Sequence, residues 1–222
     1  MAVRHVFFDI DNTLFPTSEF AELARKNAIR AMIELGLPFI DSTALYAKLL
    51  QIIKKLGSNS DQHFNELLKE LKVKKPSRYI AAAVAAYHNT KTSILPYPEV
   101  PRTLLELREN GYKLYVATDG DAIKQWDKLI RLGIALYFED VFVSEEVGME
   151  KSREFFEKVL KNLALNPKEC VMIGDKEDKD IAPARAAGMK TILADRVHLE
   201  ISGNAHNVIS NFSTLLDIIK KL

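Results

Sequence analysis

Short apolar segments alternate with longer amphipathic segments along most of the chain. The apolar segments are rich in β-branched and aromatic side chains, and they cover residues 3–8, Lys113–Ala117, Val141–Val143, Cys170–Ile173 and Thr191–Ala194. A short run that lacks a polar face is typical of a strand buried on both sides of a sheet. We therefore predict five buried strands.

Helical periodicity fills the intervals between these runs. The predicted helices are Val100–Asn110, Ala122–Leu132, Ser152–Leu163 and Ile181–Ala187. Gly111, Gly133 and Gly188 follow three of them, in the position where glycine favours helix termination. The alternation of strand and helix predicts an α/β fold, a doubly wound parallel sheet with right-handed crossovers and helices on both faces.

Residues 15–94 show a different pattern, because they carry helical periodicity without a convincing strand. The helices predicted here are Phe20–Leu35, Ala44–Leu56, Asp61–Leu71 and Ser77–His88. Gly36-Leu37-Pro38 ends the first of them. A helical insertion directly after the first strand predicts a cap domain at 15–94, hinged over a core formed by residues 1–14 and 95–222.

Composition changes this picture little. Of the 222 residues, 47% are hydrophobic and 27% are charged, as in an ordinary globular protein, and the net charge of +1 offers no basic surface for nucleic acid. No apolar run approaches the length of a membrane helix, and the N-terminus reaches carboxylates too early for a signal peptide. A cytoplasmic location is therefore expected. The single Cys170 excludes a disulfide framework within the chain.

Polar residues follow the predicted strands, at the positions where each apolar run stops. They are Asp9-Ile10-Asp11-Asn12-Thr13, Thr118-Asp119-Gly120, Lys151, and Gly174-Asp175 with Asp178 and Asp180 close behind. In parallel sheets ligands bind at the carboxyl ends of the strands, so these residues are expected to meet at one edge. Carboxylates crowded there repel one another unless a cation neutralises them. Oxygen ligands favour Mg²⁺ over zinc, since none of the five histidines has metal-ligand spacing with another histidine or with the cysteine.

The order of these motifs resembles that of the haloacid dehalogenase-like (HAD) superfamily of phosphohydrolases. Asp9 to Thr13 resembles the first motif, Thr118 the second, Lys151 the third, and the segment from Gly174 to Asp180 the fourth. The resemblance implies a Rossmann-like core with a helical cap. Wider stretches around these motifs resemble an archaeal branch of the superfamily that includes glyceraldehyde-3-phosphate phosphatase-like proteins.

By this resemblance, Asp9 and Asp11 divide the chemistry between them. Asp9 is expected to attack phosphorus and form an aspartyl-phosphate, which splits one difficult displacement into two easier ones. Asp11 is expected to protonate the leaving oxygen and then to deprotonate the attacking water, so it must be protonated part of the time. Asp9, the backbone carbonyl of Asp11, and Asp175 are expected to hold the Mg²⁺, with Asp180 or Asp178 in support.

The resemblance also implies a phosphate-binding set. Thr118 is expected to donate a hydrogen bond to a phosphoryl oxygen, next to Asp119 and Gly120 in the same turn. Lys151 is expected to steady both Asp9 and the transferring charge. Residues of the predicted cap near its hinge, Thr17 to Glu19, are further candidates for substrate contact.

Three functions remain open on the sequence. The first is hydrolysis of a small phosphomonoester, without nucleic acid or membrane as a partner. The second is phosphoryl transfer within a sugar phosphate, a mutase reaction that needs the same residues. The third is a non-catalytic scaffold, against which the presence of Asp9, Asp11 and Asp175 argues. A haloacid dehalogenase is disfavoured because it uses no second aspartate and no Mg²⁺. The oligomeric state is not predicted.

Overall fold

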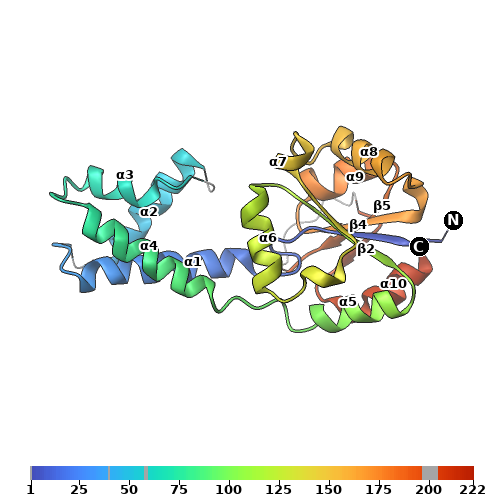
Figure 1. Cartoon of the computed structure of the whole chain (residues 1–222), viewed down its shortest axis with the longest axis horizontal. Coiled ribbons are helices and arrows are strands. Elements are labelled where there is room, and N and C mark those ends of the chain that lie inside the picture. Colours follow the sequence, from blue (N-terminus) through green and yellow to red (C-terminus); the bar gives the residue numbers. More distant parts are fainter. Residues whose placement is uncertain (1, 40, 58–59, 197–204) are drawn as a thin grey trace. The chain divides into compact units, whose positions relative to one another are not determined.

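A single parallel sheet carries all the strands found in the computed structural model, which describes residues 2–39, 41–57, 60–196 and 205–222. The sheet order is β3-β2-β1-β4-β5-β6 (Figure 1). The strands are β1 (His5–Phe8), β2 (Lys113–Thr118), β3 (Asp140–Val143), β4 (Cys170–Gly174), β5 (Lys190–Ala194) and β6 (Asn207–Ile209). The predicted α/β fold with a doubly wound parallel sheet is confirmed. Strand β6 was not predicted, because only one of its three side chains is buried and it has no apolar run.

The central strands are aligned so that their carboxyl ends meet. Phe8, the last residue of β1, pairs with Val116 of β2 on one side and with Ile173 of β4 on the other. The backbone N–H of Asp9 still donates to the carbonyl of Ile173, at 2.9 Å. Both neighbours of β1 are parallel to it, so the residues that follow all three strands lie at the same edge.

Helices cover both faces of the sheet (Figure 1). Helices α5 (Val100–Glu109) and α10 (Leu215–Lys221) pack together on one face, and α8 (Arg153–Asn162) and α9 (Ala182–Ala186) pack together on the other. The remaining elements around the sheet are α6 (Ala122–Arg131), α7 (Ser144–Val147), η1 (Ala135–Tyr137), η2 (Pro167–Glu169), η4 (Phe212–Thr214) and the π-helical turn η3 (Glu177–Ile181). Buried aromatic and aliphatic side chains, among them Phe7, Phe155 and Phe156, form the core under α8 and α9.

The glycines predicted to end helices adopt the left-handed conformation that this role requires. Gly111, Gly133 and Gly188 have φ angles of 82°, 68° and 88°. A side chain at such a φ is strained, whereas glycine adopts it freely. Gly111 and Gly188 therefore turn the chain from a helix directly into the next strand, whereas Gly133 leads into η1 before β3 begins.

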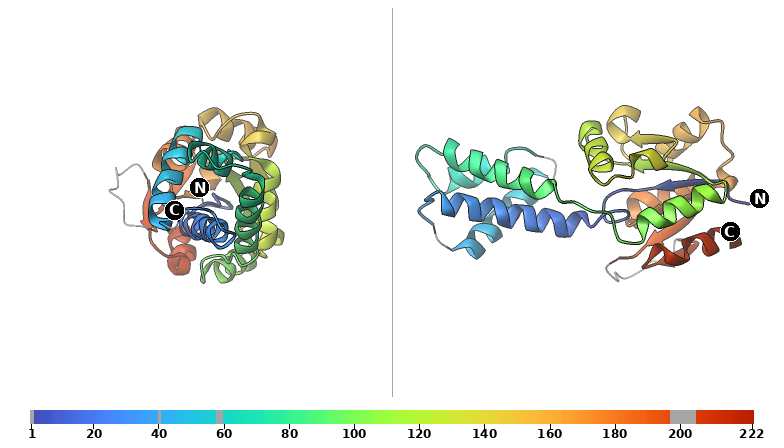
Figure 2. Two further views of the ribbon diagram at one scale, coloured as in Figure 1. Left: turned by 90° about the vertical axis from the view of Figure 1, so that its left-hand side faces the viewer. Right: turned by 60° about the horizontal axis from the view of Figure 1, so that its bottom comes forward.

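The chain folds as two compact units: unit 1 is Met1–Thr17 with Leu95–Leu222, which contains the sheet, and unit 2 is Ser18–Ile94. Unit 2 holds α2 (Ser42–Leu56), α3 (His63–Glu70), α4 (Ser77–Lys91) and all of α1 (Thr17–Glu34) except its first residue. Helices α1 and α4 lie side by side (Figure 2), tied by a 3.0 Å hydrogen bond between Asn27 and Thr90. Within the described ranges, no helix is long and apolar enough to cross a membrane.

Candidate active site

The carboxyl ends of β1 and β4 bring three carboxylates together. Asp9 follows β1, Asp175 follows β4, and Asp180 lies in the π-helical turn η3. One oxygen of each lies within 4.8 Å of the others, a separation at which one cation can contact all three. Asp9, Asp175 and Asp180 were all predicted as metal ligands, together with the backbone carbonyl of Asp11.

Lys151 is buried beside this cluster. Its Nζ lies 2.6 Å from Oδ1 of Asp9 and 2.5 Å from Oδ1 of Asp180, and the three side chains are at most 6% exposed. The backbone N–H of Lys151 donates to Oδ1 of Asp119 at 2.8 Å. The next residue, Ser152, caps α8 through its side chain. Lys151 is thus fixed at its backbone as well as at its ammonium group.

The structure around β4 places Asp180, and not Asp178, in the carboxylate cluster. Asp180 is fully buried, and its Oδ2 accepts a hydrogen bond from the backbone N–H of Lys176 at 3.0 Å. Asp178, in the same turn, is exposed. Gly174 makes this arrangement possible, because a Cβ there would lie 2.3 Å from Cγ of Asp180. π-Helical turns are uncommon and occur frequently at functional sites.

Burial and mutual repulsion disfavour the ionised carboxylates. Burial raises the pKa of Asp9 to about 7, with Lys151 opposing the shift and the neighbouring carboxylates adding to it. Burial likewise raises the pKa of Asp175 to about 6, with Asp180 as the next cause. The pKa of Lys151 is raised although burial alone would lower it, because Asp180 and Asp9 stabilise its charge. One buried ammonium does not offset the charge of all three aspartates.

These residues fit a hard divalent cation. All donors of the cluster are carboxylate oxygens, the ligand type that Mg²⁺ and Ca²⁺ prefer. Oδ1 of Asp175 is buried and has no hydrogen-bond partner among the described residues, so it is available as a ligand. A cation there would stabilise the ionised forms of Asp9 and Asp175, whose pKa values are raised in its absence.

We predict that stabilisation by Mg²⁺ grows with pH. A carboxyl whose folded pKa is raised favours the folded state at low pH, and this contribution is lost as pH rises through the folded pKa, here about 6 for Asp175 and about 7 for Asp9. Mg²⁺ competes with these protons. Differential scanning fluorimetry should show a larger rise in melting temperature with Mg²⁺ at about pH 8 than at about pH 5. Equal shifts at both pH values, or a full shift in the Asp175→Asn variant, would contradict the prediction.

The side chain of Asp11 is not part of the carboxylate cluster and pairs with Lys128. Nζ of Lys128 lies 2.5 Å from its Oδ1 and 2.8 Å from its Oδ2. Thr17 donates to Oδ1 at 2.6 Å, and Nε2 of Gln125 lies 3.5 Å from Oδ2. Burial would raise the pKa of Asp11, but the Lys128 charge and these hydrogen bonds outweigh it and lower the pKa. The sequence predicted a partly protonated Asp11; these contacts favour its ionised form.

The turn after β2 holds the other predicted site residues. Thr118 is buried at the end of the strand, and its Oγ1 has no hydrogen-bond partner among the described residues. Asp119 uses one carboxylate oxygen to hold the backbone of Lys151. Gly120 has a φ of 126°, and its N–H donates to Oγ of Ser144 at 2.9 Å. Thr118 is therefore the member of this turn with an unused buried hydroxyl.

Lys128 and Gln125 were not predicted as site residues. Both belong to α6, whose buried face carries Ala122, Gln125 and Leu129. The sequence does hold one signal, since an amide at position 125 interrupts an otherwise apolar stripe at helical spacing. Thr17 was a candidate for substrate contact; its hydroxyl donates to Asp11 in the structure, and contact of residues 17–19 with substrate stays a prediction.

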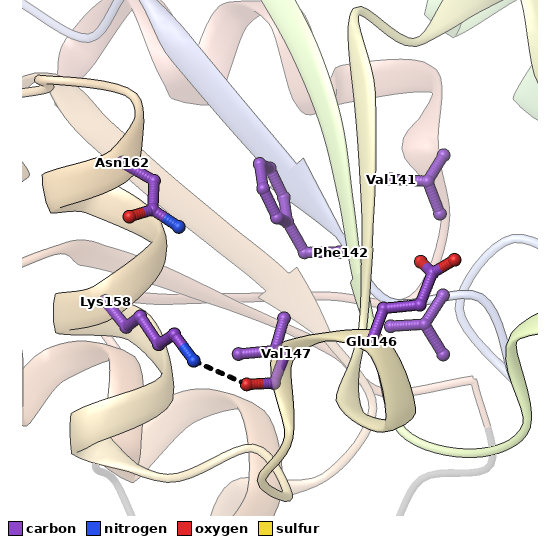
Figure 3. Close-up of a pocket in the computed structure, with 7 residues that line it drawn as sticks. Val141, Phe142, Glu146, Val147, Lys158 and Asn162 are labelled. Atoms are coloured by element: carbon purple, nitrogen blue, oxygen red, sulfur yellow. Dashed lines mark hydrogen bonds between the residues drawn. The ribbon is translucent and has the colours of Figure 1, made fainter.

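A separate surface pocket contains none of these residues. Its volume is about 250 Å³, and it lies by the edge strand β3 (Figure 3). Its lining residues are Val141, Phe142, Val143, Glu146, Val147, Lys158 and Asn162. The Lys158 ammonium donates to the carbonyl of Val147 at 2.6 Å, as Figure 3 shows. This pocket offers no nucleophile beside a base, so the candidate chemistry stays with the aspartate cluster.

The sequence is similar to the family described as haloacid dehalogenase-like hydrolase, whose profile matches residues 3–188. The glyceraldehyde 3-phosphate phosphatase of Methanopyrus kandleri is 43% identical over 229 residues, covering 99% of this chain and 98% of that protein. The glyceraldehyde 3-phosphate phosphatase of Methanothermobacter thermautotrophicus is 43% identical, covering 98% of this chain and 100% of that protein. The crystal structure of a HAD phosphatase from Thermococcus onnurineus matches with a TM-score of 0.68 at 24% identity, covering 99% and 98% of the two chains, which shows the fold alone.

Proposed function

The chain belongs to the haloacid dehalogenase-like hydrolases and is a phosphatase of that family, and from this premise we propose that it hydrolyses glyceraldehyde 3-phosphate with Mg²⁺ as cofactor. The family resemblance inferred from the motifs is confirmed by the matches to the family and to the archaeal phosphatases. The observation that carries the mechanism is the cluster of Asp9, Asp175 and Asp180, in which the Lys151 ammonium pairs with Asp9 and Asp180.

In the first step the Asp9 carboxylate attacks phosphorus. The bond between phosphorus and the leaving alcohol oxygen breaks, and the phosphoryl group is held on Asp9 as an aspartyl-phosphate. The Lys151 ammonium, 2.6 Å from Oδ1 of Asp9, fixes the orientation of the nucleophile. Its charge also stabilises the negative charge that spreads over the phosphoryl oxygens. The buried hydroxyl of Thr118 donates to one of these oxygens.

Asp11 handles the protons of both steps. Its contacts favour the ionised form in the substrate-free protein, and the negative charge of a bound phosphate group would oppose this effect and favour the protonated form. As an acid Asp11 then gives a proton to the departing alcohol oxygen, and as a base it accepts one from the water that releases phosphate from Asp9. Asp9, the backbone carbonyl of Asp11, Asp175 and Asp180 would hold the Mg²⁺. When bound, this ion supplies positive charge that neutralises the carboxylates and polarises the phosphoryl group.

Unit 2 is proposed as the cap domain of the enzyme. Its four-helix core is separate from the sheet, and the chain enters it after Thr17 and leaves it before Leu95. A helical cap can exclude water during the transfer and select the leaving group. The cytoplasmic location and the absence of a nucleic-acid partner stay predictions.

The substrate is tested with a panel of alkyl phosphates and sugar phosphates, with and without Mg²⁺, by measuring the release of phosphate and identifying the organic product. We expect glyceraldehyde 3-phosphate to show the highest kcat/KM, by about tenfold over glycerol 3-phosphate and phosphoserine, a difference of about 1.4 kcal/mol. Because the aldehyde releases phosphate spontaneously, the Asp9→Asn variant serves as the blank.

The outcomes of this panel separate the parts of the proposal. A different best substrate would contradict the assignment of glyceraldehyde 3-phosphate and leave the hydrolytic mechanism standing. An isomerised sugar phosphate without free phosphate would instead identify a mutase. Phosphate release that does not depend on Mg²⁺ would contradict the cofactor.

A further inference from the structure

Helix α6 carries a polar network that ends on Asp11. Lys128 contacts both carboxylate oxygens, at 2.5 and 2.8 Å, and is only 18% exposed at its side chain. Gln125 lies one turn earlier on the same helix and is 4% exposed. Residues three apart lie on the same face of a helix, so one rigid element presents both side chains to Asp11.

The orientation of the Gln125 amide follows from its neighbours. Nε2 lies 2.6 Å from the carbonyl of Asp119 and 3.5 Å from Oδ2 of Asp11, and both of these groups only accept hydrogen bonds when Asp11 is ionised. The nitrogen must therefore face them. Gly120 leaves the room for this, because a Cβ there would lie 2.9 Å from Nε2. Glycine at position 120 therefore allows the Gln125 amide to pack against the turn that follows β2.

The two oxygens of Asp11 are held unequally. Oδ1 accepts from Lys128 at 2.5 Å and from Thr17 at 2.6 Å, so two short bonds fix it. Oδ2 has the longer contact to Lys128, at 2.8 Å, and the 3.5 Å contact to Gln125. A group that transfers a proton needs one fixed oxygen to set its direction and one oxygen that can exchange a proton. The geometry assigns the second role to Oδ2.

We propose that Lys128, supported by Gln125, is a positioning residue that aims Oδ2 of Asp11 at the leaving-group oxygen. This inference rests on the proposed function and adds residues that act through Asp11 rather than on the substrate. The proton moves from Oδ2 to the alcohol oxygen as the bond to phosphorus breaks, and the carboxylate that remains is held by Lys128 and Thr17. Lys128 serves this step by fixing the direction of the carboxyl group and not by helping it to hold a proton, because removal of its charge would favour protonated Asp11. Without Lys128 the carboxyl group would rotate, and effective acid catalysis depends on orientation.

The test uses the leaving group to separate positioning of the acid from a general structural role. An alkyl phosphate releases a poor leaving group that needs a proton, whereas p-nitrophenyl phosphate releases a stabilised anion that does not. In the full-length Lys128→Met variant we expect kcat for the best alkyl phosphate of the panel to fall about 10²-fold, and kcat for p-nitrophenyl phosphate to fall less than about fivefold. KM should change little in either case, and Gln125→Leu should show the same selectivity with a smaller loss.

The controls make each outcome decisive. Lys124→Met, on an exposed position of the same helix, should leave both rates unchanged. Retained turnover of p-nitrophenyl phosphate shows that the variant is folded and that Asp9 still reacts. An equal loss on both substrates, no loss on either, or a loss confined to the aryl substrate would overturn the assignment. If the unaltered enzyme hydrolysed neither substrate, the proposed function itself would fail.

Discussion

The Asp9→Asn variant should lose at least about 10³-fold in kcat, because an amide cannot form the aspartyl-phosphate. The loss should not come from unfolding. Burial and neighbouring carboxylates raise the pKa of Asp9 to about 7, so the ionised group is unfavourable in the metal-free protein. The amide oxygen can still accept from Lys151, and Asp180 still compensates the buried ammonium.

Thermal unfolding measured beside the kinetics checks this separation. The melting temperature of metal-free Asp9→Asn at about pH 8 should equal or exceed that of the unaltered protein, since a crowded charge has been removed. Asp217→Asn, an exposed position on α10, is the matched control and should retain full activity. Activity of Asp9→Asn within tenfold of the unaltered enzyme would exclude Asp9 as the nucleophile.

The Lys151→Met variant should be both inactive and unstable. Lys151 is 4% exposed and is the shared ion-pair partner of Asp9 and Asp180, which are 6% and 0% exposed at their side chains. Removal of one partner from a buried ion pair leaves an uncompensated charge and costs about 3–5 kcal/mol. We expect a loss of that size in the free energy of unfolding, measured by urea denaturation of the metal-free protein.

An exposed lysine in the same region supplies the comparison. Lys179 pairs with Glu150 at 2.7 Å, with 38% and 77% of the two side chains exposed. Exposed ion pairs contribute about 0–1 kcal/mol, so Lys179→Met should be close to neutral. Mg²⁺ should restore part of the stability of Lys151→Met, because a cation can replace some of the missing charge. A loss from Lys151→Met no larger than that from Lys179→Met would contradict the electrostatic role of Lys151.

The sheet and the gathering of Asp9 and Asp175 could be predicted because both follow from local patterns. Strands buried on both faces give continuous apolar runs, and parallel strands align their carboxyl ends. Residues that stop β1 and β4 are therefore neighbours in space although they are far apart in the chain. Strand β6 has one buried side chain and α10 only two, so neither has a pattern strong enough to be identified.

The choice between Asp178 and Asp180 and the partners of Asp11 could not be predicted in the same way. A π-helical turn changes the residues per turn, so the sequence alone does not determine which aspartate of η3 faces the cluster. Lys128 and Asp11 are 117 positions apart in the chain, and the long, flexible lysine side chain brings its ammonium group to the carboxylate. Charged residues on helices are mostly solvated, so no local pattern distinguished Lys128 from the other lysine and arginine residues of α6.

Identification of the phosphorylated residue is the most direct test of the central claim, that Asp9 is the nucleophile of the cluster. The enzyme would be mixed with substrate and Mg²⁺, quenched, and treated with borohydride, which reduces an acyl phosphate to an alcohol. Mass spectrometry of the digested protein should find the reduced side chain at position 9, and none in the Asp9→Asn variant. Reduction at another aspartate, or a phosphoryl group on a different type of side chain, would contradict the mechanism.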